Sequence, residues 1–153
     1  MMEFSLESYK EIILDLQSRG FSFLHPGSWD LESVDLGLEF GDLPDKAVLL
    51  RHDVDMGLHA SLEMAELEES LGVRSYYFFQ LTSPFYSLLS PDSLQIFDMI
   101  RMQGHGVGLH LDPSTDLAVH TELDIFSSLA ETVEYLPVSL HNPSVTDSDA
   151  FVQ

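Results

Sequence analysis

The spacing of apolar and polar residues predicts a helix, a strand and a loop in the first third of the chain. Apolar side chains recur at helical intervals over residues 6–19, and Gly20 follows as a helix stop. Residues 21–25 (FSFLH) are typical of a short strand. Residues 26–45 are rich in Pro, Gly and Asp and predict a long loop before the next regular element.

From residue 46 onward the pattern alternates regularly between strands and helices. Short apolar runs predict strands at 46–55, 75–81, 105–112 and 138–144. Apolar residues at helical spacing predict helices at 58–71, 91–103 and 120–136. Ser90 is a good N-cap, Pro91 suits a first helical position, and Gly72, Gly104 and Pro137 are predicted stops. Four strands joined by three helices are typical of a parallel α/β fold.

Composition indicates one globular domain over residues 1–153. Hydrophobic residues make up 44% of the chain, so an apolar core is expected. Asp and Glu total 26 against 6 Lys and Arg, and the net charge of -20 would repel nucleic acid and anionic membranes, so neither is expected as a partner. The first residues (MMEFSLESYKEIILDL) match neither a signal peptide nor a membrane helix, and a cytoplasmic protein is expected.

Charged residues end the first strand of the alternating series. In RHDVD at 51–55, strand alternation puts Arg51, Asp53 and Asp55 on one face, about 6.5–7 Å apart along the chain. Burying two carboxylates costs several kcal/mol each unless a cation lies beside them. A metal ion, Arg51 or both would supply that cation. Alternatively, the two acids cap the next helix or lie in a solvated loop.

The third strand of the series combines glycine with histidine and aspartate. Alternation in GHGVGLHLD puts Gly106, Gly108, His110 and Asp112 on one face. Glycine offers nothing to pack in a strand and often marks close approach by another backbone or by a ligand. A metal ion or a substrate is therefore one candidate for the space beside these residues.

Candidate site residues fall at the ends of three different predicted strands: Asp53, Asp55, His110, Asp112 and His141. The carboxyl ends of parallel strands meet at one rim, where sites are assembled in α/β folds. Because the chain has no cysteine, a metal ion at this rim must be bound by His, Asp or Glu. A surface or core role is expected for four other histidines, namely His25, His59, His105 and His120.

Three motifs together resemble those of the NodB-type polysaccharide deacetylase superfamily, within it a divergent group of deacetylase-like proteins. They are RHDVD at 51–55, GLHLD at 108–112 and SLHNPS at 139–144, and the resemblance spans about residues 46–144. It implies a fold of parallel (β/α) units resembling part of a distorted (β/α) barrel. It also implies removal of N-acetyl or O-acetyl groups from carbohydrates with zinc or a similar divalent ion.

The resemblance assigns roles to residues of the first two motifs. Asp53 corresponds to the general base, and Asp55 and His110 correspond to metal ligands. Aspartate and histidine suit a borderline divalent ion such as zinc, and three protein ligands would leave one position open for water.

The third protein ligand and the general acid are less directly assigned. Ser114 stands where the family has a second histidine ligand, which leaves Asp112 and His141 as candidates. We assign Asp112 to the metal, because the family places an arginine near the position of His141. His141, toward the C-terminal end of the chain, is then the side chain that can protonate the leaving amine or alcohol.

The expected function is that of a metal-dependent deacetylase acting on an acetylated sugar or a carrier-linked carbohydrate. One alternative is a non-catalytic or truncated deacetylase-like chain that binds metal without turnover. Another is a related metal-dependent hydrolase that cleaves an amide in a small molecule. The family's late histidine motif has no counterpart here, so the domain is expected to be C-terminally incomplete relative to the family. An uncovered sheet edge would then favour self-association into a homo-oligomer.

Overall fold

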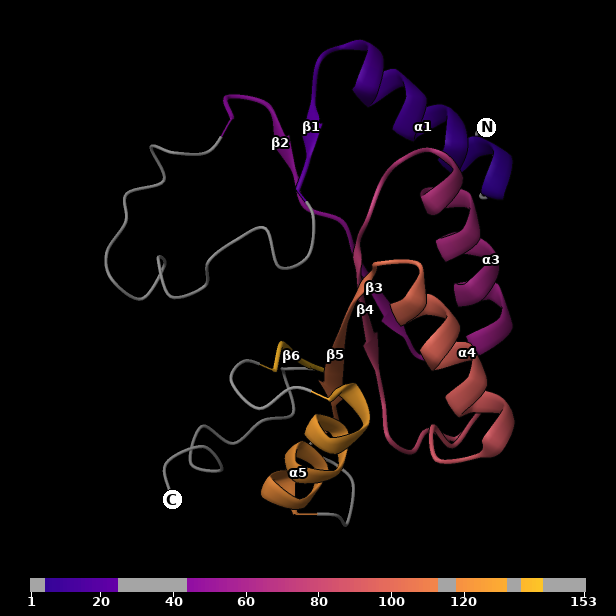
Figure 1. The fold of residues 1–153 in the computed structure, drawn as a ribbon, viewed down its shortest axis with the longest axis vertical. Coiled ribbons are helices and arrows are strands. Elements are labelled where there is room, and N and C mark those ends of the chain that lie inside the picture. Colours follow the sequence, from indigo (N-terminus) through magenta and orange to yellow (C-terminus); the bar gives the residue numbers. More distant parts are fainter. Residues whose placement is uncertain (1–4, 25–43, 113–117, 132–135, 142–153) are drawn as a thin grey trace.

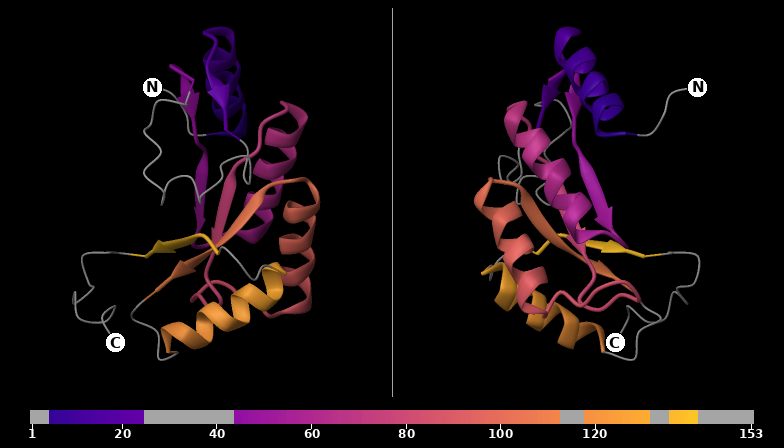
Figure 2. Two further views of the ribbon diagram at one scale, coloured as in Figure 1. Left: turned by 60° about the vertical axis from the view of Figure 1, so that its left-hand side comes forward. Right: turned by 90° about the vertical axis from the view of Figure 1, so that its right-hand side faces the viewer.

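The computed structural model describes residues 5–24, 44–112, 118–131 and 136–141, which form alternating strands and helices (Figure 1). Strands β1 (Ser22–Phe23) and β2 (Ala47–Val48) pair in a small parallel sheet. A larger, curled sheet contains β3 (Arg51–Val54), β4 (Tyr76–Phe79), β5 (Gly106–Leu111) and β6 (Val138–Leu140) (Figure 2). Its strands are all parallel in the order β3-β4-β5-β6, which confirms the predicted α/β class. Most of the predicted loop at 26–45, with His25, Ser114 and residues 142–144, lies outside the described residues.

Four helices lie within the described residues: α1 (Leu6–Ser18), α3 (Leu58–Ser70), α4 (Pro91–Met102) and α5 (Val119–Ala130). Helices α3 and α4 pack side by side, α1 contacts α3, and α5 contacts β5 (Figures 1 and 2). The core lies between the strands and the helices and includes Val54, Phe79, Phe97, Leu109 and Phe126. None of the helices in the described ranges is long and apolar enough to cross a membrane.

The start of α4 and the ends of α3 and α4 follow the local sequence signals. Ser90 caps α4 by accepting a hydrogen bond from the backbone N–H of Ser93, and Pro91 is the first helical residue. Gly72 and Gly104 lie just beyond α3 and α4 with φ of 71° and 85°. Glycine adopts this left-handed conformation without a steric penalty, so the predicted helix ends are confirmed.

The predicted strand at 46–55 is divided between the two sheets. Ala47–Val48 pairs with β1, whereas Arg51–Val54 pairs with β4. Alternation along the sequence reports an extended conformation, but it does not show which strand lies next to it. The prediction of one strand was therefore wrong, because the pairing partner changes between Val48 and Arg51.

The last helix is shorter than predicted. The apolar pattern extended it to Leu136, but α5 ends at Ala130. Glu131 has a φ of 54°, in the left-handed region, which stops the helix. Arg101 of α4 donates hydrogen bonds to the Leu129 carbonyl and to the Glu131 carboxylate, both at 2.8 Å. A contact between two helices therefore marks this end.

Close packing between strands explains the glycine in the middle of β5. A Cβ atom at Gly108 would lie 2.5 Å from Cε1 of Phe78 and 2.7 Å from the carbonyl oxygen of Pro137. Such distances are far inside van der Waals contact, so no other residue fits without a shift of its neighbours. Of the two alternatives predicted for this glycine, close approach by another backbone is therefore the one that applies at Gly108, where the Phe78 ring and the backbone at Pro137 fill the space.

A buried carboxylate links α1, α3 and the sheet on the helical side. Glu68 of α3 is fully buried and accepts hydrogen bonds from Tyr9 Oη (2.5 Å), His52 Nε2 (2.7 Å), Ser75 Oγ (2.5 Å) and Tyr77 Oη (2.8 Å). Burial acts to raise the pKa of Glu68, but hydrogen bonds from His52, Ser75 and Tyr9 outweigh it, and the net pKa is lowered. Glu68 therefore stays ionised within the core.

The remaining histidines in the described ranges do not belong to the group of possible metal ligands at the strand ends. His105 is buried beside the Glu68 carboxylate, and His59 and His120 are exposed. These positions confirm the surface or core role predicted for the three. His52 points to the helical side and Asp53 to the opposite face of β3, as strand alternation predicts.

Candidate metal site

Polar side chains form a row at the carboxyl edge of the large sheet. Val54 pairs with Phe79, and Phe79 pairs with Leu109. The residues that follow Val54, Phe79 and Leu109 are Asp55, Gln80 and His110. Ser139 of β6 pairs with His110 and completes the row. His141 follows β6 directly and has the same strand parity as Ser139, so both side chains belong to the face that carries His110.

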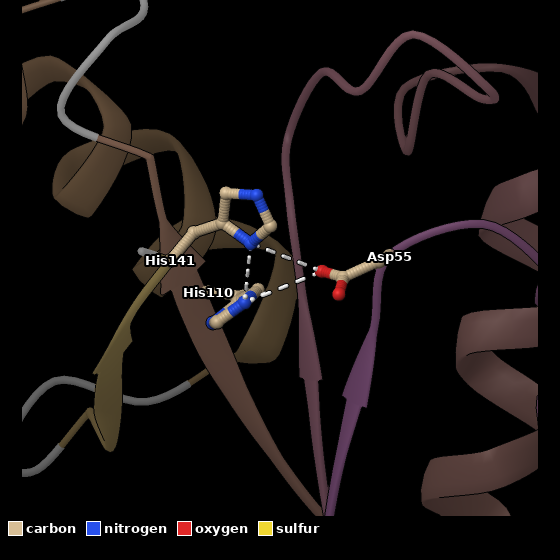
Figure 3. Close-up of side chains that lie close together, drawn as sticks. All are labelled: Asp55, His110 and His141. Carbon is tan, nitrogen blue, oxygen red and sulfur yellow. Dashed lines mark hydrogen bonds and ion pairs between the residues drawn. The ribbon is translucent and has the colours of Figure 1, made fainter. Parts of the chain in front are cut away.

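Ligand atoms of Asp55, His110 and His141 converge at this edge (Figure 3). Asp55 Oδ1 lies 3.3 Å from His110 Nε2 and 3.3 Å from His141 Nδ1, and the two nitrogens are 3.1 Å apart. The imidazole rings are nearly perpendicular, with an interplanar angle of 89°. The three atoms therefore form an almost equilateral triangle.

This triangle has the dimensions of a metal site. Ligand atoms bound at about 2.0–2.1 Å to a tetrahedral zinc ion are separated from one another by about 3.4 Å. The observed separations of 3.1–3.3 Å come within a few tenths of an ångström of that value. Two imidazoles and one carboxylate also match the donor types that zinc and other first-row divalent ions prefer. The group fits a divalent metal ion with an open fourth position.

Burial keeps His110 in the neutral form. The residue is 3% exposed, and burial lowers its pKa, an effect that the charges of Asp53 and Asp55 oppose without reversing it. His110 is therefore neutral at neutral pH, and a neutral imidazole is the form that ligates metals.

Outer contacts hold two of the three ligands in place. Ser139 Oγ lies 2.6 Å from His110 Nδ1, and Gln80 Nε2 donates a hydrogen bond to Asp55 Oδ1 at 3.3 Å. Ser83 Oγ also donates to the Asp55 backbone carbonyl at 3.3 Å. Ser139 and Gln80 were not among the site residues predicted from the sequence. The available signal was strand parity, since Ser139 lies two residues before His141.

Asp53 lies on β3, two residues before Asp55, and forms an ion pair with Arg51. The Arg51 guanidinium donates from Nε to Asp53 Oδ1 and from Nη2 to Asp53 Oδ2, both at 2.8 Å, and it lies 4.9 Å from the centre of the Phe78 ring. Arg51 is thus the cation that the sequence required beside Asp53. The negative charges of Asp53 and Asp55 both act to raise the pKa of His110, against the larger effect of burial.

The structure brings together Asp55, His110 and His141, and Asp53, in β3, lies two residues before Asp55. Asp112, predicted as a ligand, is not a member of this group. It lies two residues beyond His110, just after β5 ends, a step of about 6.5–7 Å in an extended chain. His141 instead comes from the neighbouring strand, where its backbone N–H bonds to the Leu111 carbonyl, and its ring reaches back toward His110.

Comparisons with protein-family models, curated proteins and solved structures found no match for this chain. The resemblance to polysaccharide deacetylases therefore depends on the three sequence motifs. The arrangement of Asp55, His110 and His141 is a separate observation, because it depends on how the strands are placed in space.

Proposed function

We propose that the protein is a zinc-dependent hydrolase that removes an acetyl group from an acetylated sugar. The observation that carries the proposal is the triangle of ligand atoms from Asp55, His110 and His141, whose dimensions suit a zinc ion. The motifs at 51–55, 108–112 and 139–144 support the choice of an acetylated carbohydrate as substrate.

Asp53 is the proposed general base. A zinc ion held by the triangle would polarise the acetyl carbonyl and lower the pKa of a neighbouring water molecule toward about 7. Asp53 takes the proton of the water that attacks the carbonyl carbon, while Arg51 keeps the carboxylate oriented. The bond between the acetyl carbon and the sugar nitrogen or oxygen then breaks. The leaving atom receives the proton from Asp53, and acetate is released.

His141 has a different role in this proposal from the one predicted from its sequence motif. Its Nδ1 lies 3.1 Å from His110 Nε2 and 3.3 Å from Asp55 Oδ1, in the position of a ligand. With Nδ1 bound to zinc, His141 cannot become the imidazolium that serves as a general acid, so Asp53 replaces it as the acid that protonates the leaving group. Metal binding by His141 also makes the triangle complete without Asp112.

The alternative function is metal binding without turnover, and the Arg51–Asp53 pair favours it. Both carboxylate oxygens of Asp53 accept a hydrogen bond from Arg51 at 2.8 Å. To take the proton of the water, an Asp53 oxygen would have to give up part of its charge-assisted hydrogen bonding to Arg51, which is a penalty on its role as base. The two side chains are 48% and 36% exposed, so water screens the pair and reduces this penalty.

A metal titration combined with an acetate-release assay tests the proposal. The metal-stripped full chain is titrated calorimetrically with Zn, Co, Ni and Mn, and the loaded protein is then incubated with N-acetylated and O-acetylated sugars. His110→Ala should lose metal and turnover, whereas Asp53→Asn should keep the metal and lose turnover. His120→Ala, an exposed histidine on α5, is the control and should change neither.

The outcomes separate the two functions. Zinc binding with acetate release supports the deacetylase, and binding without release from any acetylated sugar supports the non-catalytic alternative. Absence of binding heat with all four metals would rule out both.

A further inference from the structure

We propose that Ser139 is a positioning residue for the metal site. Its hydroxyl accepts a hydrogen bond from Nδ1–H of His110, which leaves the lone pair on His110 Nε2 free to bind the metal. This inference depends on the metal site in the proposed function, but it concerns a residue that does not touch the metal.

The sheet register brings Ser139 and His110 together. The two residues are direct partners in the pairing of β5 with β6, and Ser139 Oγ lies 2.6 Å from His110 Nδ1. Ser139 is 5% exposed and His110 is 3% exposed, so water does not compete for this contact. A short, dry hydrogen bond to one ring nitrogen fixes the orientation of the whole imidazole.

This orientation aims the second nitrogen at the other ligands. His110 Nε2 lies 3.3 Å from Asp55 Oδ1 and 3.1 Å from His141 Nδ1. A neutral imidazole carries one N–H, so a proton on Nδ1 means a lone pair on Nε2. With the opposite tautomer, Nε2–H would point at Asp55 and would exclude a cation from the triangle.

A serine hydroxyl suits this position because it both donates and accepts hydrogen bonds. Without metal, Ser139 can donate to Nδ1 while His110 Nε2–H faces Asp55; with metal, Ser139 accepts from Nδ1–H. The ring does not need to turn between the two states. Ser139 therefore lets the site load metal without rearranging His110, and β6 supplies both this residue and the ligand that follows it, His141.

Variants of Ser139 test the role through metal affinity and the spectrum of the bound metal. Ser139→Ala should raise the Kd for zinc by about 10–100-fold, the usual effect of removing such an outer contact. It should also shift the visible absorption bands of the cobalt-loaded protein, because His110 is no longer held in one orientation. Ser139→Thr keeps the hydroxyl and should restore the Kd to within about threefold of the unmutated value. Ser93→Ala is the matched control, since Ser93 is equally buried at 5% but lies on α4.

The results distinguish failure of this inference from failure of the proposed function. If the unmutated protein binds zinc and Ser139→Ala changes neither the Kd nor the cobalt spectrum, the role of Ser139 is overturned and the metal site remains. If the unmutated protein binds no metal, both are overturned.

A second measurement covers the case in which Ser139→Ala does not fold. Side-chain ¹H–¹⁵N spectra of the zinc-loaded, unmutated protein report which nitrogen of His110 carries the proton. A proton on Nδ1 supports the inference, and a proton on Nε2 overturns it.

Discussion

Asp55 Oδ1 lies 3.3 Å from His110 Nε2, although the two residues belong to strands that are not neighbours. Asp55 follows β3 and His110 lies in β5, with β4 between them. Adjacent strands are about 4.8 Å apart, so β3 and β5 are about 10 Å apart with β4 between them. The two side chains meet above β4, and Gln80 at the end of that strand donates a hydrogen bond to Asp55 Oδ1. The curl of the sheet, visible in Figure 2, allows side chains of one face to converge.

Replacing His141 distinguishes a metal ligand from a general acid. Because His141→Ala removes one of three protein ligands, we expect the Kd for zinc to rise by at least about 100-fold, as measured by competition with a chromogenic chelator. His59→Ala, at an exposed position, serves as the control and should leave the Kd unchanged. An unchanged Kd for His141→Ala, with slower acetate release, would instead assign His141 as the general acid.

Removing the buried carboxylate of Glu68 should destabilise the protein strongly. In Glu68→Ala, four donor groups of the core lose their shared acceptor, and we expect the free energy of unfolding to fall by about 3–5 kcal/mol in urea denaturation. Glu69→Ala is the matched control. The Glu69 side chain is 46% exposed and lies 3.7 Å from Arg74, so this change should cost less than about 0.5 kcal/mol. Equal losses in the two variants would contradict the stabilising role of the buried network.

A methyl group at Gly108 should be poorly tolerated. Its Cβ would meet the Phe78 ring at 2.5 Å and the Pro137 carbonyl oxygen at 2.7 Å, and we expect Gly108→Ala to cost about 2–3 kcal/mol of stability. At Gly57 the nearest atom to an added Cβ is Cβ of Ala60 at 3.5 Å, an ordinary contact. Gly57→Ala should therefore cost less than about 1 kcal/mol. Similar urea midpoints for the two variants would argue against the close packing of β4, β5 and β6.

His105 should make the metal-free protein less stable in acid. Burial lowers the pKa of His105, an effect that the nearby Glu68 charge only partly offsets. Its Nδ1 accepts a hydrogen bond from the Ser75 backbone N–H at 3.2 Å, and Nε2 faces the Ala65 carbonyl at 3.1 Å, so the neutral ring is satisfied. Below about pH 6.5 the unfolded chain binds a proton here that the folded protein does not, and stability falls by up to about 1.4 kcal/mol per pH unit.

Urea denaturation at pH 7.5 and pH 5.5 measures this effect. His105→Gln cannot take up the proton, and we expect it to lose less stability between the two pH values than the unmutated protein does. His59→Gln, at an exposed position, is the control and should lose as much stability between the two pH values as the unmutated protein does. If His105→Gln loses as much stability as the unmutated protein, a group other than His105 causes the loss of stability in acid.

The order of strands and helices was predictable because its signals are local. Helix starts and stops depend on residues such as Ser90 and Gly104, whose effect on the backbone needs no distant partner. Strand alternation is equally local, and it correctly separated His52 from Asp53. The position of Asp55, His110 and His141 at strand ends was predictable for the same reason.

Contacts between different strands and helices were decided only by the tertiary structure. Parity shows that His110 and Asp112 share a face, but the distance from either to Asp55 depends on strand order, register and curl. The burial of Glu68, an acid in a helical pattern, likewise depends on donors that come from α1, β3 and β4. The sequence alone therefore placed Asp55, His110 and His141 at the rim. The packing of the strands decided that His141 joins the ligand group and that Ser139 lies behind His110, because those distances are set by neighbours remote in the chain.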